Sequence, residues 1–231
     1  MSQTINLDEV DVDGAIREAA AQTDGDTRLG FLRKAGVAGG AVIGGGAILA
    51  AVAPSAQAFV QHGRPPKSFG KGDVGILNFA LTLEYLEAAF YNGATAANLP
   101  LSPQAAAFLK VVTRDENAHV AFLKTALGKR AVAKPRFDFK GTNEDAATFM
   151  ATAAVLENTG VHAYLGQITN IEHADYVRAA GSIITIEARH ASVIGLLNEP
   201  NGEAIAPSGP FDTPLTAHEV LTAVTGTGFI V

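Results

Sequence analysis

The pentapeptide Asp115-Glu-Asn-Ala-His119 places a glutamate and a histidine three residues apart in the middle of an amphipathic segment. Residues three apart are neighbours on one face of a helix, so Glu116 and His119 share a face. The same face carries an apolar stripe, made of Leu109, Val112, Leu123 and Ala126. Burying a charged group in such a stripe is costly unless something compensates the charge. The segment therefore predicts a buried helix with polar chemistry at its centre.

Three further segments repeat this pattern. Glu187-Ala-Arg-His190 is a second Glu-x-x-His pair, set in a stripe of Tyr176, Ala180, Ile183, Ile194 and Leu197. Glu84 interrupts a stripe of Leu77, Leu81, Ala88 and Tyr91, and Glu157 interrupts one of Met150, Ala153, Gly160, Tyr164 and Gln167. One Glu-x-x-His pair is weak evidence, but two that alternate with helices carrying a central glutamate are specific. We expect four helices that direct ionisable groups into one core.

Turn and capping residues place the ends of these helices. The first is expected over 73–92 with a stop at Gly93, and the second between a Ser102-Pro103 start and Gly128. The third should begin near Asn143, with Glu144 and Asp145 in its first turn. After a break at 172–175 the fourth helix should run to about residue 198.

The connection over 129–142 differs from the others, because Pro135, Phe137, Phe139 and Gly141 favour extended chain over helix. It reaches roughly 46 Å when extended, whereas a 25-residue helix is about 37 Å long. The connection can therefore cross the whole bundle. The sequence predicts an all-α fold, an antiparallel four-helix bundle with one long crossover between helices 2 and 3. A short C-terminal helical tail over 215–224, capped at Thr213-Pro214, should pack on it.

An internal repeat supports a single shared centre. Tyr91 follows Glu84 by seven residues, and Tyr164 follows Glu157 by seven. The first two helices thus resemble the last two, so we expect a pseudo-twofold bundle around one site. Both tyrosines are interpreted as core aromatics whose hydroxyls bond across helices; a role beside a ligating carboxylate is the alternative.

Four carboxylates in one core repel each other, and two divalent cations would cancel their charge while neutral imidazoles complete the coordination. The predicted metal ligands are Glu84, Glu116, His119, Glu157, Glu187 and His190. The first helix leaves a choice open, because Glu87 lies one turn from Glu84. The chain has no cysteine, which excludes thiolate sites and favours iron or manganese. Asp115 and Arg189 are candidates for supporting the ligands or for surface ion pairs, and the remaining histidines should lie outside the site: His62, His162, His173 and His218.

Composition bounds the class of protein. The 231 residues are 48% hydrophobic and 17% charged, enough for a substantial core. The formal net charge of −6, without a dense Lys/Arg stripe, excludes a nucleic-acid binder.

The first 58 residues have the order of an export signal. An acidic stretch over 1–27 precedes the basic patch 28–34, and 35–58 has no charge and ends in Ala-Gln-Ala. The patch resembles a twin-arginine signal with Leu29 in place of the second arginine. We expect an exported protein (periplasm, cell envelope or extracellular), with a membrane tether as the alternative if the segment is retained. The expected organisation is a signal over 1–58, a linker over 59–72, the bundle over 73–198 and a loop with a short helix over 199–231.

Three motifs resemble the ferritin-like domain family, in the branch that includes desiccation-related proteins and exported bacterial homologues. They are residues 79–91 (Phe-Ala-Leu-Thr-Leu-Glu-Tyr-Leu-Glu-Ala-Ala-Phe-Tyr), Asp115-Glu-Asn-Ala-His119 and Glu187-Ala-Arg-His190. The resemblance covers about residues 70–198. It implies a ferritin-like bundle with a di-iron or di-manganese carboxylate site, one Glu from each of two helices and Glu-x-x-His from the others.

Two classes of function fit this reading. Two iron or manganese ions could support redox chemistry on dioxygen or peroxide, ferroxidase-like or catalase-like, with a role in oxidative stress protection. The alternative is a non-enzymatic stress-protective bundle with a structural or vestigial metal site. The partner is then a small oxidant, not nucleic acid. Whether the chain is an enzyme, and whether it forms a homo-oligomer, stays open at the level of sequence.

Overall fold

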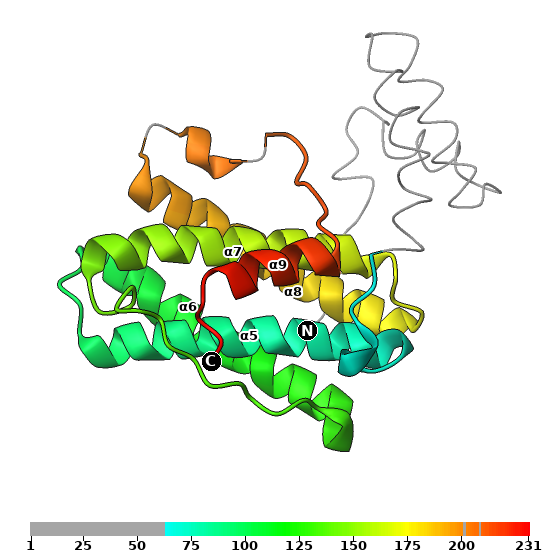
Figure 1. Cartoon of the computed structure of the whole chain (residues 1–231). Helices are drawn as coiled ribbons and strands as arrows, with labels where there is room; N and C mark the ends of the chain where they lie inside the picture. The colour runs from blue at the N-terminus through cyan, green and yellow to red at the C-terminus, as the bar shows by residue number, and fades with distance from the viewer. Residues whose placement is uncertain (1–62, 201, 208) are drawn as a thin grey trace, which may run out of the picture. The chain divides into compact units, whose positions relative to one another are not determined.

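A computed structural model describes residues 63–200, 202–207 and 209–231, and over these residues the protein is helical without strands (Figure 1). The helices are α5 (Gly72–Ala97), α6 (Pro103–Leu127), α7 (Ala146–Ile168), α8 (Ala174–Asn198) and α9 (Ala217–Gly226). Short 3-10 turns occur at Lys67–Phe69, Gly128–Arg130 and Glu203–Ile205. The predicted export signal lies outside the described residues. Among those described, no helix is both long and apolar enough to cross a membrane.

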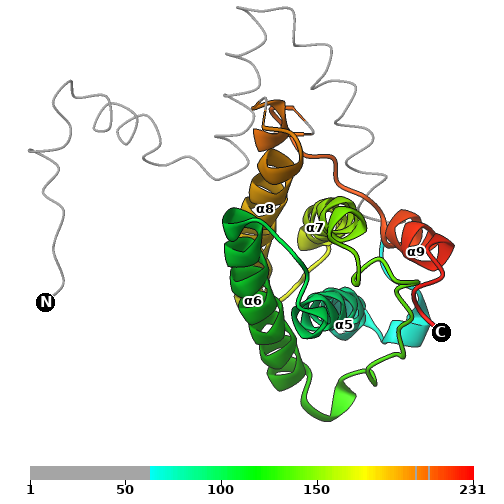
Figure 2. The same ribbon diagram turned by 90° about the vertical axis from the view of Figure 1, so that its left-hand side faces the viewer.

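The four long helices form the predicted all-α bundle. α5 packs mainly on α6, and α7 mainly on α8, so each half is a helical pair with a short connection. The long connection from α6 to α7 joins the two pairs, as the view along the bundle shows (Figure 2). α9 lies against α7 on the outside of the bundle. The fold class predicted from the sequence is therefore confirmed.

Helix starts follow the capping chemistry, with one correction. The Ser102 hydroxyl accepts a hydrogen bond from the backbone N–H of Ala105, and Pro103 is the first helical residue, as predicted. Asp145 is not in the first turn of α7; it is the cap, and its carboxylate accepts from the N–H of Thr148 at 2.9 Å. The helix begins at Ala146 because Asp145 satisfies a free N–H only from an extended backbone.

Gly93 does not end the first helix, as the sequence led us to expect. α5 continues to Ala97, and Asn98 follows it in the left-handed conformation, with φ 51°. The reason for a glycine at 93 is close packing. A Cβ at this position would lie 2.2 Å from the side-chain nitrogen of Asn143, which reaches over α5 from the crossover.

The C-terminal helix begins two residues later than predicted. Its cap is Thr216, not Thr213, and Thr216 and Glu219 form a reciprocal capping box. Leu215 is outside the helix, and its N–H donates to the carbonyl of His162 on α7 at 3.1 Å. The end of the chain returns to the crossover through a bridge between Phe137 and Ile230. These bonds attach the tail to the bundle.

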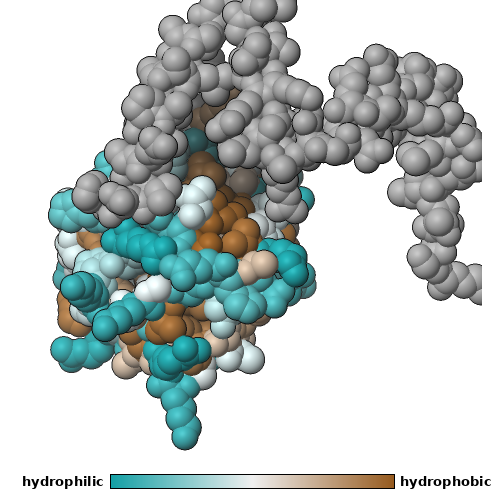
Figure 3. All heavy atoms as spheres, turned by 90° about the vertical axis from the view of Figure 1, so that its right-hand side faces the viewer, coloured by the Kyte–Doolittle hydropathy of each residue, from teal (hydrophilic) through white to brown (hydrophobic). Residues whose placement is uncertain are grey.

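Two apolar clusters fill the bundle. One contains Tyr91 with stacked rings of Phe90 and Phe149, whose centroids are 5.5 Å apart, and the other contains Leu81, Leu123 and Tyr164. On the face shown in Figure 3, apolar residues gather in the middle and hydrophilic residues surround them. Each cluster contains one tyrosine whose hydroxyl donates to a buried glutamate: Tyr91 to Glu157 and Tyr164 to Glu84. Packing in the two clusters therefore holds both tyrosines in place.

Candidate metal centre

The structure brings all six predicted ligands together at the centre of the bundle. Two groups of potential ligand atoms form, and in each group the atoms lie within 4.8 Å of one another. The first is Glu84, Glu116, His119 and Glu187; the second is Glu116, Glu157, Glu187 and His190. The four glutamates are 0% exposed, and the two histidines are 9% and 5% exposed. Two glutamates, Glu116 and Glu187, belong to both groups.

His119 organises the first group. Its Nδ1 lies 3.2 Å from one carboxylate oxygen each of Glu84, Glu116 and Glu187. Three helices thus converge on one imidazole nitrogen. These spacings are hydrogen-bond distances, and the same oxygen and nitrogen atoms would hold a divalent cation.

His190 plays the same part in the second group. Its Nδ1 lies 3.2 Å from Glu116 Oε1 and 3.2 Å from Glu157 Oε2. Glu116 therefore directs Oε1 to His190 and Oε2 to His119. One carboxylate with an oxygen in each group has the arrangement of a bridging ligand.

Partners outside the two groups hold these side chains in place. The Tyr91 hydroxyl donates to Glu157 Oε1, and the Tyr164 hydroxyl donates to Glu84 Oε1 at 2.5 Å. Asp115 Oδ2 lies 3.3 Å from Nε2 of His190, which leaves Nδ1 to face the carboxylates. Such outer partners fix the orientation of metal-binding imidazoles. The position of Asp115 corresponds to the supporting role considered from the sequence.

Several buried atoms of the site lack a hydrogen-bond partner, which tests whether a metal fits. They are Glu116 Oε1, Glu157 Oε2, both carboxylate oxygens of Glu187 and Nδ1 of His190. Unsatisfied buried polar atoms are costly and rare in native proteins. These five atoms are carboxylate oxygens or an imidazole nitrogen, and among the other described residues only Asn170 Oδ1 is a fully buried side-chain atom without a partner. The residues present therefore fit a carboxylate-rich site for divalent cations.

Electrostatics among these groups shift their pKa values strongly. Burial and the nearby charge of Glu84 together raise the pKa of Glu116 to about 7, against the lowering effect of the two imidazoles. Burial alone would lower the pKa of His190, but the carboxylates of Glu116 and Glu157 raise it to about 11. The pKa of His119 is also raised, well above its usual range, by adjacent carboxylates. Without a cation, protons supply the positive charge that the glutamates require.

Metal affinity should therefore rise with pH. Both imidazoles remain protonated across pH 6 to 8, because their pKa values lie above that window, so each ion must displace a proton. If two protons leave, the overall binding constant rises about 100-fold per pH unit. Mn(II) titrations at pH 6, 7 and 8, with a dye that reports released protons, measure this slope. A binding constant independent of pH would contradict the prediction.

Glu84 and Glu87, between which the sequence leaves the first-helix ligand open, differ in their position relative to the two groups. Glu84 lies in a group of potential ligands, and Glu87 does not, yet Glu87 is only 3% exposed. Burial and the charges of Glu187 and other glutamates raise the pKa of Glu87 well above its usual range. The sequence signal was the spacing of three residues from Glu84, which places both on one face. From the sequence, Glu87 stays the alternative to Glu84 as the ligand of the first helix.

The other candidate polar residues lie away from the centre. Arg189 is exposed and donates to the carbonyl of Thr185, so it does not neutralise the ligands. His173 caps α8, and its Nδ1 accepts from the N–H of Asp175. His162 and His218 belong to neither group, and His62 lies outside the described residues.

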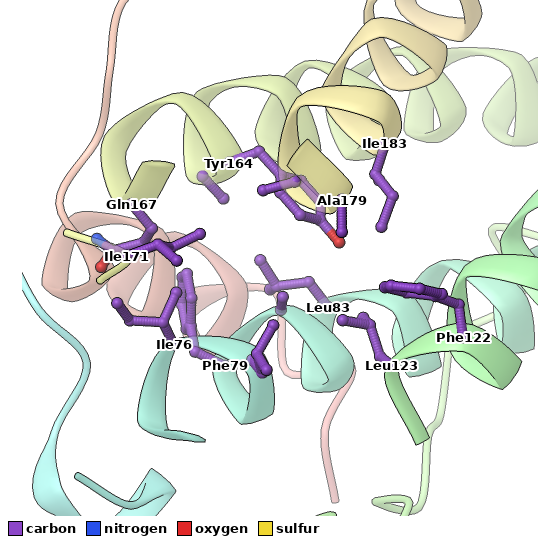
Figure 4. A pocket seen from close by; sticks show the side chains of 14 residues that line it. Ile76, Phe79, Leu83, Phe122, Leu123, Tyr164, Gln167, Ile171, Ala179 and Ile183 are labelled. Atoms are coloured by element: carbon purple, nitrogen blue, oxygen red, sulfur yellow. The ribbon is translucent and has the colours of Figure 1, made fainter. Parts of the chain in front are cut away.

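Two pockets of the described structure are lined in part by residues that belong to the site or contact it. Tyr164 is one of the residues that line an apolar pocket with a cavity volume of about 20 Å³ (Figure 4), and its hydroxyl donates to Glu84. Its lining includes Ile76, Leu83, Phe122 and Ile183. A groove of about 460 Å³ between α6 and α8 is lined in part by Asp115 and His190. The groove therefore reaches one residue of the second group, His190, from the surface.

Comparison with known proteins adds one positive finding. A family model described as a ferritin-like domain matches residues 72–199, from the first residue of α5 to the residue after α8. No curated protein matches the chain. The matched range covers more than half of the sequence and contains every residue of the two groups.

Proposed function

The chain belongs to the ferritin-like domain family, and on this premise we propose that it is an exported di-metal carboxylate protein. In this proposal two iron or manganese ions carry out redox chemistry on dioxygen or peroxide, as a ferroxidase-like or catalase-like activity in stress protection. The desiccation-related branch, suggested by residues 79–91, is part of the same proposal.

One observation carries the proposal: two groups of buried ligands share Glu116 and Glu187. Shared carboxylates hold two ions close together, and paired ions can act on one small molecule. A single structural ion needs only one group. Because the donors are carboxylates and imidazoles, iron and manganese suit them better than metals that prefer thiolates.

The residues around the ligands have definable tasks. Tyr91 and Tyr164 fix one carboxylate oxygen each of Glu157 and Glu84, which leaves the second oxygen free to face inward. Asp115 holds the ring of His190. The apolar clusters cover much of the centre, and the four glutamates are fully buried. When bound, the ions would supply the change of oxidation state that no side chain here can provide.

Export is supported by sequence alone. The basic patch over 28–34, the uncharged segment over 35–58 and its Ala-Gln-Ala end have the order of a signal. The absence of cysteine is compatible with an oxidising compartment. Fractionation of cells that make the chain, with detection in cytoplasmic, membrane and exported fractions, tests this part separately.

The activity is tested with the full chain loaded anaerobically with Fe(II) or Mn(II). We expect rapid oxidation of bound Fe(II) on mixing with dioxygen or peroxide, or release of dioxygen from peroxide by the manganese form. Free metal at the same concentration is the control. A protein that binds metal, melts at a much higher temperature with it and reacts with neither oxidant would instead support the structural alternative.

A further inference from the structure

Glu87 is a buried carboxylate that the six-residue site does not use. It is 3% exposed and lies on α5, one turn after Glu84. Among the described residues, it takes part in no hydrogen bond or ion pair, although the Glu84 carboxylate one turn earlier has both. A carboxyl group in such surroundings is costly to ionise, and it loses hydrogen bonds to water when it is buried. The burial of Glu87 without a hydrogen-bond partner therefore needs a functional or structural explanation.

The surroundings of Glu87 point toward the shared ligands. The charges that act on it most strongly come from Glu187 and then Glu116, the two glutamates common to both groups. No lysine or arginine is among its strongest interactions. The carboxylates that interact most strongly with Glu87 are thus the two that both groups share.

Gly160 on α7 makes room for this arrangement. A Cβ there would lie 2.8 Å from Glu187 Oε2 and 3.3 Å from Glu87 Oε1. The two carboxylates thus converge on one point of the α7 surface, next to a residue that has no side chain. Any larger residue at 160 would push at least one of them away.

We propose that Glu87 is a further carboxylate ligand of the metal centre, which takes a position beside Glu187 when metal is bound. Glu87 is outside both groups in the structure, so its side chain changes rotamer to reach an ion. A glutamate has the rotatable bonds for this movement, and Gly160 leaves the space.

The balance of charge between ions and carboxylates suggests what Glu87 would do as a ligand. This step rests on the redox function proposed above. Two divalent ions neutralise the four glutamates of the two groups. A pair with one divalent and one trivalent ion carries a fifth positive charge, which Glu87 would neutralise. As a ligand, Glu87 would bind a divalent pair as well, and it would stabilise the pair of higher charge more strongly.

The test uses Co(II), which needs no oxidant and reports its coordination in the visible spectrum. The full chain, Glu87→Gln and Glu87→Asp are titrated with Co(II), and their metal-free melting is recorded. Glu144→Gln, an exposed change, is the matched control. We expect both variants at 87 to bind Co(II) about 10- to 100-fold more weakly, with altered spectra, as for other supporting groups. Metal-free Glu87→Gln should melt close to the wild type, because an amide of the same shape replaces a carboxyl group that makes no hydrogen bond.

Equal affinity and an unchanged spectrum in Glu87→Gln would overturn the proposal and make Glu87 a structural carboxylic acid. Wild-type affinity for Co(II) in Glu87→Asp, but not in Glu87→Gln, would also overturn the proposal. A shorter carboxylate that cannot reach the ion would then be enough, so the negative charge and not a bond to the metal would explain the effect. If Co(II) binding depends on Glu87 but the iron form is inert toward oxidants, the result supports Glu87 as a ligand and contradicts the proposed redox function. A wild type that binds no Co(II) would overturn both.

Discussion

Replacing Glu116 with alanine should remove both metal ions, not one. Its Oε1 faces His190 and its Oε2 faces His119, so each group loses a ligand in one step. Two ions present at 100 times their dissociation constants would stabilise the folded state by about 5 kcal/mol in total. For a domain of this size that corresponds to roughly 10–20 °C in melting temperature. The metal-dependent gain in melting temperature should disappear in the variant.

Elemental analysis of purified protein, beside melting with and without Mn(II), measures both effects. Glu84→Ala is the informative comparison, because Glu84 belongs only to the first group and its loss should leave about half of the metal. Glu144→Ala, on the surface, should retain all of it. Equal metal content in Glu116→Ala and Glu84→Ala would show that Glu116 does not bridge.

Gly166→Ala should destabilise the protein strongly although the change adds a single methyl group. A Cβ at 166 would lie 1.8 Å from the carbonyl oxygen of Leu215 and 2.7 Å from its carbonyl carbon. Backbone atoms cannot rotate away, so the segment before α9 must move and the bond from Leu215 to His162 is lost. We expect a loss of about 3 kcal/mol, near the upper end for overpacked sites. That loss lowers the melting temperature by roughly 6–12 °C.

Gly181→Ala provides the control for this change. Gly181 lies within α8, and a Cβ there meets nothing within 4 Å. Alanine in an open helical position should stabilise by about 0.5–1 kcal/mol. Thermal melting compares the two variants, and limited proteolysis reports whether the residues after 213 become accessible in Gly166→Ala. Melting of Gly166→Ala within 1 °C of the wild type would rule out the steric account.

Helix existence followed from the sequence, whereas several helix ends did not. The apolar stripes around the four central glutamates are local patterns, and they identified every long helix. Gly93 was misread as a stop because its purpose is contact with Asn143, fifty residues away. Thr216 was missed as a cap because Thr213-Pro214 offers a similar local signal. Local rules cannot rank equivalent signals when distant packing decides between them.

The sequence alone determined the donor chemistry and its symmetry. Spacing of three residues put each Glu-x-x-His pair on one face, and the Glu-to-Tyr spacing of seven revealed two related halves. That these six residues bind metal is a prediction. The composition of the cluster, four carboxylates and two imidazoles, needed no tertiary information, because helical geometry fixes which residues share a face.

Only the tertiary structure decided which side chains of one helical pair contact those of the other pair. Tyr91 donates to Glu157 and Tyr164 donates to Glu84, so each tyrosine supports the glutamate of the other half. The shared position of Glu116 and Glu187, and the burial of Glu87 opposite Gly160, likewise appear only when four helices meet. Sequence periodicity fixes the direction of a side chain around its own helix axis. The distances between helices, and hence which partner it meets, depend on the packing of all four.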